Sequence, residues 1–192
     1  MFFSFSIKKE WVKERKLYLL MKEIDQSLFD QVYELMSQSF PTSEYRTYDG
    51  QLDLLSNPLY QLYGRFNEKK QMDGFIASWE FSCFRFVEHL AVNPTLRGAG
   101  IGSKLVIDYL RKDLNKTVVL EVEPPHDEMA QRRIGLYNKL GFQVNNYTYA
   151  QPALREGGAE LPLLIMSYPA LLSPIEFDHV KHVLYSKVYG TY

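Results

Sequence analysis

The sequence predicts an α/β domain: a mixed, mostly antiparallel central sheet of about seven strands flanked by helices, with an extra C-terminal helix. Two observations carry this prediction. Helical and strand-like hydrophobic periods alternate along the chain. Three strand-like runs, rich in aromatic and β-branched residues, also follow one another between residues 60 and 92 with short polar turns between them. This order is typical of a mixed sheet covered by helices.

The individual elements follow from hydrophobic spacing and from the residues that end each run. A strand-then-helix pattern begins near residues 17–24, and the first helix ends at Pro41. Asn57 and Pro58 end the second helix, and Gly141 stands at the usual C-terminal position of a later one. After the opening strand, the predicted order is helix 27–40, helix 49–56, strand 60–66, strand 74–84, strand 86–92, helix 98–112, strand 117–122, helix 127–140, strand 142–149, strand 161–168 and helix 173–189.

Length and composition indicate one globular domain. With 192 residues and an apolar fraction of 46%, the chain can bury one substantial core. We expect residues 21–170 to form the domain, with residues 1–20 as an N-terminal extension. Residues 171–192 are expected to add a C-terminal helix packed on the domain.

Charge and cysteine content exclude several classes of partner and site. The chain has 22 Lys and Arg against 23 Asp and Glu, so it has no global basic field for nucleic acid or anionic membrane. No apolar run approaches the roughly 18 residues of a membrane span. The single cysteine, Cys83, excludes an intramolecular disulfide, and its F-S-C-F context predicts a buried thiol. We therefore expect a cytoplasmic protein with no nucleic-acid or membrane partner and no metal ligands.

A glycine-rich turn precedes one of the predicted helices. Residues 97–102 read R-G-A-G-I-G, although each glycine inside a helix costs roughly 1 kcal/mol relative to alanine. Glycine leaves the backbone N–H groups of a helix N-terminus uncovered, and the helix dipole adds positive charge there. Arg97 supplies a fixed cation beside these groups. The pattern therefore predicts that a pyrophosphate binds at the start of this helix.

Two known designs use glycines in this way, and the first is the dinucleotide-binding fold of nicotinamide-dependent oxidoreductases. That fold places G-x-G-x-x-G directly after a strand, with an acidic residue about twenty positions later. Here residues 93–97 separate the strand from the glycines, so the tight turn is absent. The near match consists of Gly98, Gly100 and Ser103, followed by Glu121 or Glu123.

The second design matches better. The stretch V-N-P-T-L-R-G-A-G-I-G resembles the acetyl-CoA signature of the GCN5-related N-acetyltransferases (GNAT), Arg/Gln-x-x-Gly-x-Gly/Ala, at Arg97, Gly100 and Gly102. The stretch L-Y-N-K-L-G-F, residues 136–142, resembles the family's second signature, a helix ending in Tyr-x-x-x-Gly-Phe. The order of elements agrees over residues 17–168, whereas the last helix and the first twenty residues fall outside the common family core.

The resemblance implies that residues 21–170 are an N-acetyltransferase domain. Such a domain transfers an acetyl group from its cosubstrate acetyl-CoA to a primary amine by direct attack. The resemblance implies that Glu88 is the catalytic base, directly or through water, and that Tyr137 is the general acid near the CoA sulfur. The cofactor-binding residues that it implies are Leu90, Ala91 and Val92, whose backbone would pair with the pantetheine arm, and Arg97, Gly98, Ala99, Gly100, Ile101, Gly102 and Ser103.

Each of these side chains also has a purely structural interpretation. Glu88 could face solvent or form a salt bridge, and Tyr137 could belong to the core. Glu121 and Glu123 share one face of their strand, where they could bind the acceptor's ammonium group or be ordinary charged surface. We favour the substrate-binding role for both. His89 is expected to be buried and hydrogen-bonded rather than a base. Weaker acceptor-site candidates, on position alone, are Tyr45, Arg46 and Trp79.

The acceptor and the assembly stay open at this stage. A small-molecule amine and a peptide amine both fit the near-neutral chain, and the aromatic C-terminal run suits either core packing or a homodimer contact. A different class of function also fits the same residues. The protein could be a CoA-binding sensor or interaction module that has the GNAT fold without transferase activity.

Overall fold

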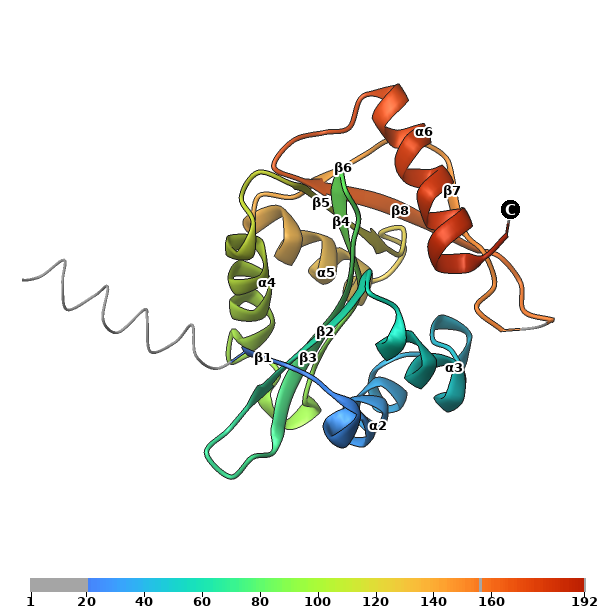
Figure 1. Ribbon diagram of the computed structural model, residues 1–192. Coiled ribbons are helices and arrows are strands. Elements are labelled where there is room, and N and C mark those ends of the chain that lie inside the picture. Colours follow the sequence, from blue (N-terminus) through green and yellow to red (C-terminus); the bar gives the residue numbers. More distant parts are fainter. Residues whose placement is uncertain (1–20, 156, 192) are drawn as a thin grey trace, which may run out of the picture.

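The computed structural model describes residues 21–155 and 157–191, so the N-terminal extension expected over residues 1–20 lies outside the described residues. In the described part, eight strands form a sheet in the order β1-β2-β3-β4-β5-β8-β6, with β7 beside β8 (Figure 1). Within this sheet β4 and β5 run parallel, and the other pairs are antiparallel. The strands are β1 (Met21–Glu23), β2 (Tyr60–Phe66), β3 (Met72–Glu80), β4 (Phe84–Val92), β5 (Thr117–Val122), β6 (Gln143–Val144), β7 (Tyr149–Gln151) and β8 (Leu161–Tyr168).

The predicted mixed, mostly antiparallel sheet is confirmed, with one more strand than expected. The run predicted as a single strand over residues 142–149 forms two short strands, β6 and β7. Buried Asn145 lies between them and donates its side-chain amide to Ile165 and Ser167, while its side-chain oxygen accepts from the Leu172 backbone. The Asn145 backbone amide also bonds to the Ile165 carbonyl, and the side-chain bonds fix the chain locally at the point where the strand divides.

Helices cover both faces of the sheet and enclose two apolar cores. One core lies between the sheet and α2, α3 and α6, and includes Phe29 and Phe177. The other lies under α4 and α5 and includes Tyr109 and Tyr137. Figure 1 shows the two helical layers on opposite sides of the strands. The helices are η1 (Gln26–Leu28), α2 (Phe29–Ser39), η2 (Thr42–Glu44), α3 (Tyr48–Asp53), η3 (Leu54–Ser56), η4 (Pro94–Leu96), α4 (Ile101–Lys112), α5 (Glu128–Lys139), α6 (Pro174–Val183) and η5 (Leu184–Tyr189).

Helix α4 begins three residues later than the sequence predicted. Gly98 and Gly100 precede the helix, with φ angles of 86° and 75°, which is the left-handed region. An L-residue adopts this region only at a steric cost that glycine avoids. Gly100 is the N-terminal cap and has no side chain to bond the first amides of α4. The glycines therefore shape the turn before the helix rather than lying inside it.

β4 and β5 pair over only part of their length. Their ladder runs from Phe84 to Val87 on β4, so among the described strands nothing pairs with this edge of β4 beyond Val87. On the other edge, Ala77 of β3 faces His89 while Ser78 faces Val87, which makes Glu88 the extra residue of a β-bulge. The sheet opens at this point and exposes the backbone of β4 next to Glu88.

The C-terminal helical segment packs on the same core as α2. Ser173 and Glu176 form a capping box at the start of α6, and Pro174 occupies its first turn. From Leu184 the helix continues as a π-helix, η5, to Tyr189. The helix predicted over residues 173–189 thus changes its winding over its last six residues. Its buried side chains are Phe177, Val180, Leu184 and Val188.

The prediction that Cys83 is buried is wrong. β3 ends at Glu80, and the amide of Phe81 bonds to the carbonyl of Phe84 across the turn that leads into β4. Cys83 lies in this turn and is exposed. Its aromatic neighbours in the sequence suggested a strand interior, but they belong to the two ends of a hairpin.

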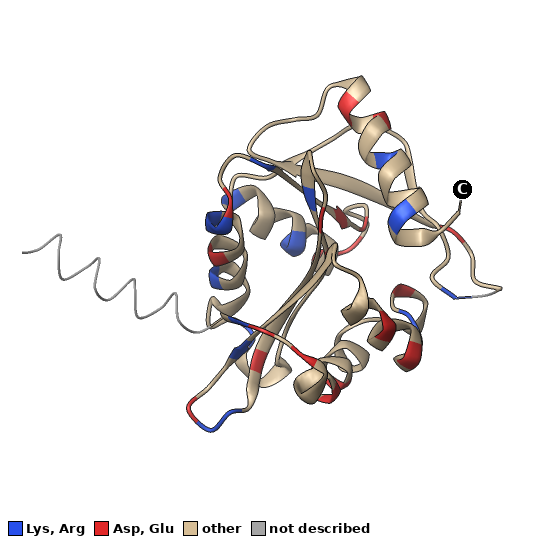
Figure 2. Ribbon diagram, in the orientation of Figure 1, with Lys and Arg blue, Asp and Glu red and all other residues tan. Residues whose placement is uncertain are grey.

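Charged residues are distributed unevenly between the two helical layers. Residues 25–56, which carry α2 and α3, include six acidic residues and one basic residue. In contrast, α4 and α5 together carry six basic and two acidic residues. Figure 2 shows this contrast as red on α2 and α3 and blue on α4 and α5. In residues 21–155 and 157–191, no helix is long and apolar enough to cross a membrane.

Candidate active site

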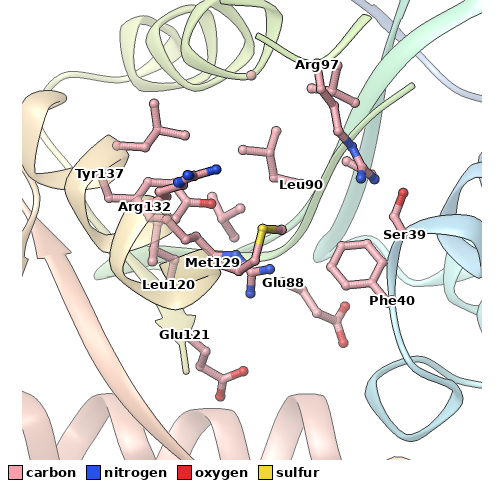
Figure 3. Close-up of a pocket in the computed structure, with 16 residues that line it drawn as sticks. Ser39, Phe40, Glu88, Leu90, Arg97, Leu120, Glu121, Met129, Arg132 and Tyr137 are labelled. Atoms are coloured by element: carbon pink, nitrogen blue, oxygen red, sulfur yellow. The ribbon is translucent and has the colours of Figure 1, made fainter. Parts of the chain in front are cut away.

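A cleft of about 440 Å³ lies where β4 and β5 diverge. Its walls come from these two strands, from the end of α2 and from α5 (Figure 3). The cleft brings together eight of the residues predicted from the sequence, which come from four separate parts of the chain. They are Glu88, Leu90, Ala91, Val92, Arg97, Gly102, Glu121 and Tyr137.

One end of the cleft lies at the N-terminus of α4. A Cβ atom built on Gly98 or Gly100 would meet no atom within 4 Å, so open space lies in front of this turn. Arg97 and Gly102 line the cleft here, whereas the side chain of Ile101 is buried in the protein. The other predicted residues of this turn, Gly98, Ala99, Gly100 and Ser103, surround the helix start without lining the cleft. Uncovered amides, the helix dipole and a nearby arginine suit a diphosphate.

Glu88 lies at the base of the cleft as a buried, ion-paired carboxylate. Its Oε1 accepts from Nη1 of Arg46 at 2.5 Å, and its Oε2 accepts from Nε1 of Trp79 at 2.9 Å. Burial alone would raise the pKa of Glu88, but the charge and hydrogen bond of Arg46 outweigh burial and hold this pKa below its usual value. Glu88 is therefore an anion at neutral pH with both oxygens engaged. The salt bridge expected as one interpretation is present, and the role of Glu88 as a base stays a prediction.

Glu121 is a second buried carboxylate of the cleft, but it has neutral partners. The Tyr189 hydroxyl lies 2.9 Å from Oε1 and 2.7 Å from Oε2, and the Tyr149 hydroxyl donates to Oε1. Burial raises the pKa of Glu121 to about 7, although both tyrosines oppose this shift. Figure 3 shows the carboxylates of Glu88 and Glu121 at the same end of the cleft. A carboxyl group that titrates near pH 7 can both accept and release a proton there.

A smaller pocket of about 50 Å³ continues from the cleft past Glu88 and Glu121. Glu44 and Glu123 also line it, and Glu123 forms an ion pair with Arg133 of α5. Burial, followed by the charge of Glu123, raises the pKa of Glu44. Glu121 and Glu123 thus share one pocket, as their spacing indicated, in a region where four carboxyl groups converge.

Tyr137 lines the cleft from α5 and packs edge-on against Phe142. Burial raises the pKa of Tyr137 to about 12, so its hydroxyl keeps its proton at neutral pH. The side chain is therefore both part of the core and a hydrogen-bond donor at the cleft. His89, the neighbour of Glu88, is buried with Nε2 bonded to the Glu44 carbonyl, as expected.

Sequence reasoning did not identify Tyr149 and Tyr189 as site residues. They reach Glu121 from β7 and η5, which are 28 and 68 residues away along the chain. Neither residue belongs to a recognisable motif, and the aromatic C-terminal run had suggested only packing. Arg46 and Trp79, which were weak candidates by position, contact Glu88 directly.

Comparison with known proteins finds relatives of similar sequence and fold. Residues 59–144 match the family described as acetyltransferase (GNAT) domain. A Bacillus subtilis protein named as an acetyltransferase, YjbC, is 31% identical over 113 residues, which are 58% of this chain. The chain spans 56% of the length of that curated relative.

Solved structures extend the match to most of the chain. A GNAT-family acetyltransferase structure from Bacteroides thetaiotaomicron superposes with a TM-score of 0.81 at 32% identity, covering 90% of this chain and 99% of that one. An aminoglycoside 6'-N-acetyltransferase complexed with coenzyme A shares the fold, with a TM-score of 0.58 at 17% identity over 77% of this chain and 95% of that one. The chain belongs to the GCN5-related N-acetyltransferase (GNAT) family of acetyltransferases.

Proposed function

We propose that this protein transfers an acetyl group from acetyl-CoA to the primary amine of a cationic acceptor, with Glu121 as the base. The observation that carries the proposal is the position of Glu121. It is a buried carboxylate with a pKa raised by burial to about 7, in the wall that the main cleft shares with a small acidic pocket. A base with a pKa near the working pH is well matched to deprotonating an ammonium group.

The main cleft has the features needed to hold acetyl-CoA. The open space at Gly98 and Gly100 leaves room for phosphates at the first amides of α4, and Arg97, Arg132 and Arg133 line the cleft with positive charge. The edge of β4 beyond Val87 offers backbone groups to an extended pantetheine chain, as an added strand would use them. When bound, acetyl-CoA supplies an acetyl thioester, whose carbonyl carbon accepts the amine.

Glu121 is better suited than Glu88 to remove the amine proton. Both oxygens of Glu88 are engaged and its pKa is lowered, whereas within residues 21–155 and 157–191 the one donor to Oε2 of Glu121 is the shared Tyr189 hydroxyl. A carboxylate oxygen offers two lone pairs, so Oε2 retains acceptor capacity. We propose that Glu88 and Arg46 form a neutral pair that fixes the base of the site. The role of Glu88 as a base stays a prediction, which a direct comparison of the two residues tests.

Two groups are suited to the negative charges that develop during transfer. An N–H group of the β4 segment Leu90–Val92 would stabilise charge on the thioester oxygen. The Tyr137 hydroxyl would donate to the departing sulfur. Because the pKa of Tyr137 is raised to about 12, above that of an ordinary thiol at about 8.5, a hydrogen bond to the sulfur is easier than complete transfer of the proton.

Charge supports a cationic acceptor. The acidic layer of residues 25–56 borders the small pocket through Glu44, and the pocket adds Glu121. Its other two carboxylates, Glu88 and Glu123, are paired with Arg46 and Arg133. An excess of acidic groups attracts ligands of the opposite charge and raises their local concentration. Both a small-molecule amine and a peptide amine meet this requirement. The cytoplasmic location and the homodimer stay predictions.

The phosphate site can be tested at Gly100. Asp and Asn both tolerate its left-handed backbone and differ mainly in charge. We expect Gly100→Asp to weaken CoA binding by at least tenfold more than Gly100→Asn, because a carboxylate there repels the diphosphate. Isothermal titration with CoA measures both dissociation constants. Equal constants for the two variants would mean that the phosphates bind elsewhere.

The base can be identified from pH profiles. A panel of amines, followed by release of free thiol from acetyl-CoA, first provides an acceptor. We expect the wild-type kcat/KM to rise with pH through a limb near 7, and Glu121→Gln to lose that limb along with roughly 100-fold or more of the rate. Glu88→Gln is the matched control and should keep the limb. Loss of the limb in Glu88→Gln alone would transfer the role to Glu88, and CoA binding without thiol release on any amine would favour the sensor function.

Glu121 also makes a prediction about stability that needs no substrate. Its pKa is about 7 in the folded protein against an ordinary 4.5, so its contribution to stability is complete below pH 4.5 and is lost as pH rises through 7. The loss amounts to about 3 kcal/mol. The Glu121→Gln variant has no such titration and does not lose this stability. The difference between its free energy of unfolding and that of the wild type should therefore increase by about 3 kcal/mol between about pH 4 and pH 8. Urea unfolding across this range measures it, and a constant difference would contradict the raised pKa.

A further inference from the structure

The π-helical winding of η5 determines where Tyr189 points. In an α-helix of 3.6 residues per turn, a residue five positions after Leu184 would lie about 140° around the axis from it. In a π-helix, i→i+5 hydrogen bonds bring residues five apart close to the same face. Leu184 is fully buried against the sheet, and η5 therefore directs Tyr189 toward the sheet as well. Gly190, with a φ of 65°, ends the segment in the left-handed conformation.

Tyr189 reaches Glu121 together with Tyr149. The Tyr189 hydroxyl lies within hydrogen-bond distance of both carboxylate oxygens and has one hydrogen to donate, while Tyr149 donates to Oε1. Oε1 therefore has two tyrosine hydroxyls within hydrogen-bond distance and Oε2 has one, so Oε2 can still accept a further hydrogen bond. Burial, followed by the charge of Glu121, raises the pKa values of both tyrosines above their ordinary value, so both hydroxyls remain donors.

The same segment also contacts the second carboxylate of the site. The Val188 carbonyl accepts from Nη2 of Arg46 at 2.7 Å, and Nη1 of Arg46 donates to Glu88. One turn of η5 thus contacts Glu121 through Tyr189 and Glu88 through Arg46. The buried side chains of Leu184 and Val188 hold this turn against the core.

We propose that Tyr189 and Tyr149 are positioning residues that hold the Glu121 carboxylate with Oε2 available to the acceptor amine, and that η5 is therefore a wall of the active site. This inference rests on the proposed function insofar as that function makes Glu121 the base. It assigns to the C-terminal helical segment, which lies outside the core shared by the family, a direct part in the acetyl transfer.

Other titratable groups face Glu121 and stay unchanged in the test. Glu88 of β4 raises its pKa, and Arg46 of the loop before α3 lowers it. Glu44, His89, Glu123 and Arg133 line the same small pocket. Because all six remain in place when a tyrosine hydroxyl is removed, a change in the titration of Glu121 reports the loss of that hydroxyl.

The test is the titration of Glu121 in the full-length protein without substrate. Carbon-13 NMR of protein labelled at the Glu side-chain carboxyl carbon follows each group, and the signal missing from Glu121→Gln assigns residue 121. We expect Tyr189→Phe and Tyr149→Phe each to raise the pKa of Glu121 by about one unit, because each loses a hydrogen bond to the anion. The acidic limb of kcat/KM should move to higher pH by the same amount.

Tyr185→Phe is the matched control from the same segment. The Tyr185 hydroxyl donates to the Ala150 carbonyl rather than to Glu121, so this variant should leave the Glu121 titration unchanged. Titrations of Tyr189→Phe and Tyr149→Phe that equal that of Tyr185→Phe would overturn the proposal. Loss of the fold in both variants, seen by circular dichroism, would also overturn it, because the hydroxyls would then serve the core.

The two proposals can fail separately. If the pKa of Glu121 shifts in the NMR titration while the kinetic limb stays in place, the tyrosines position Glu121. In that case Glu121 is not the base, and this part of the proposed function is wrong. If neither the titration nor the limb shifts, the positioning role fails and the proposed base is untouched.

Discussion

The early end of the β4–β5 ladder is the constraint on which the rest of the site depends. The two strands pair only as far as Val87, and the bulge at Glu88 turns that side chain into the protein at the point where they diverge. Without this divergence, Glu88 and Glu121 would lie on a continuous sheet with no cleft between the strands. Because of it, a free backbone edge, two carboxylates and the N-terminus of α4 all border one cavity of about 440 Å³.

Two neighbouring carboxylates in this cleft have different hydrogen-bond partners, and their pKa values shift in opposite directions. Glu88 has a permanent cation, Arg46, within hydrogen-bond distance, and its pKa falls. Among the described residues, the donors to Glu121 are the neutral hydroxyls of Tyr149 and Tyr189, so burial dominates and its pKa rises to about 7. Pairs of titratable groups whose surroundings separate their pKa values commonly divide acid–base roles between them. Burying a carboxylate among neutral donors costs free energy, and a glutamine in a purely structural role would avoid that cost. The presence of Glu121 is therefore consistent with a functional role.

Local patterns in the sequence predicted the fold class and most of the helices and strands. They also predicted the part of the site formed by the glycine turn and helix α5. The glycine turn and the Tyr-x-x-x-Gly-Phe helix lie within short stretches, so their chemistry can be recognised without knowing any long-range contact. The partners of the two carboxylates could not be predicted in this way. Arg46 reaches Glu88 across 42 positions and Tyr189 reaches Glu121 across 68, and the direction of Tyr189 depends on a π-helical turn that no periodicity in the sequence marks. The two wrong predictions have different causes. Cys83 lies in a short turn closed by a bond between Phe81 and Phe84, whereas the strand after Phe142 divides at Asn145, whose side chain bonds to distant backbone.

A crystal structure of the protein with coenzyme A would show where the cosubstrate binds. We expect the diphosphate at the amides of residues 98–103, the pantetheine arm along Leu90–Val92, and the sulfur beside Tyr137 on the side of the cleft that Glu121 lines. Coenzyme A bound outside the divergence of β4 and β5, or with its sulfur remote from Glu121, would contradict this expectation.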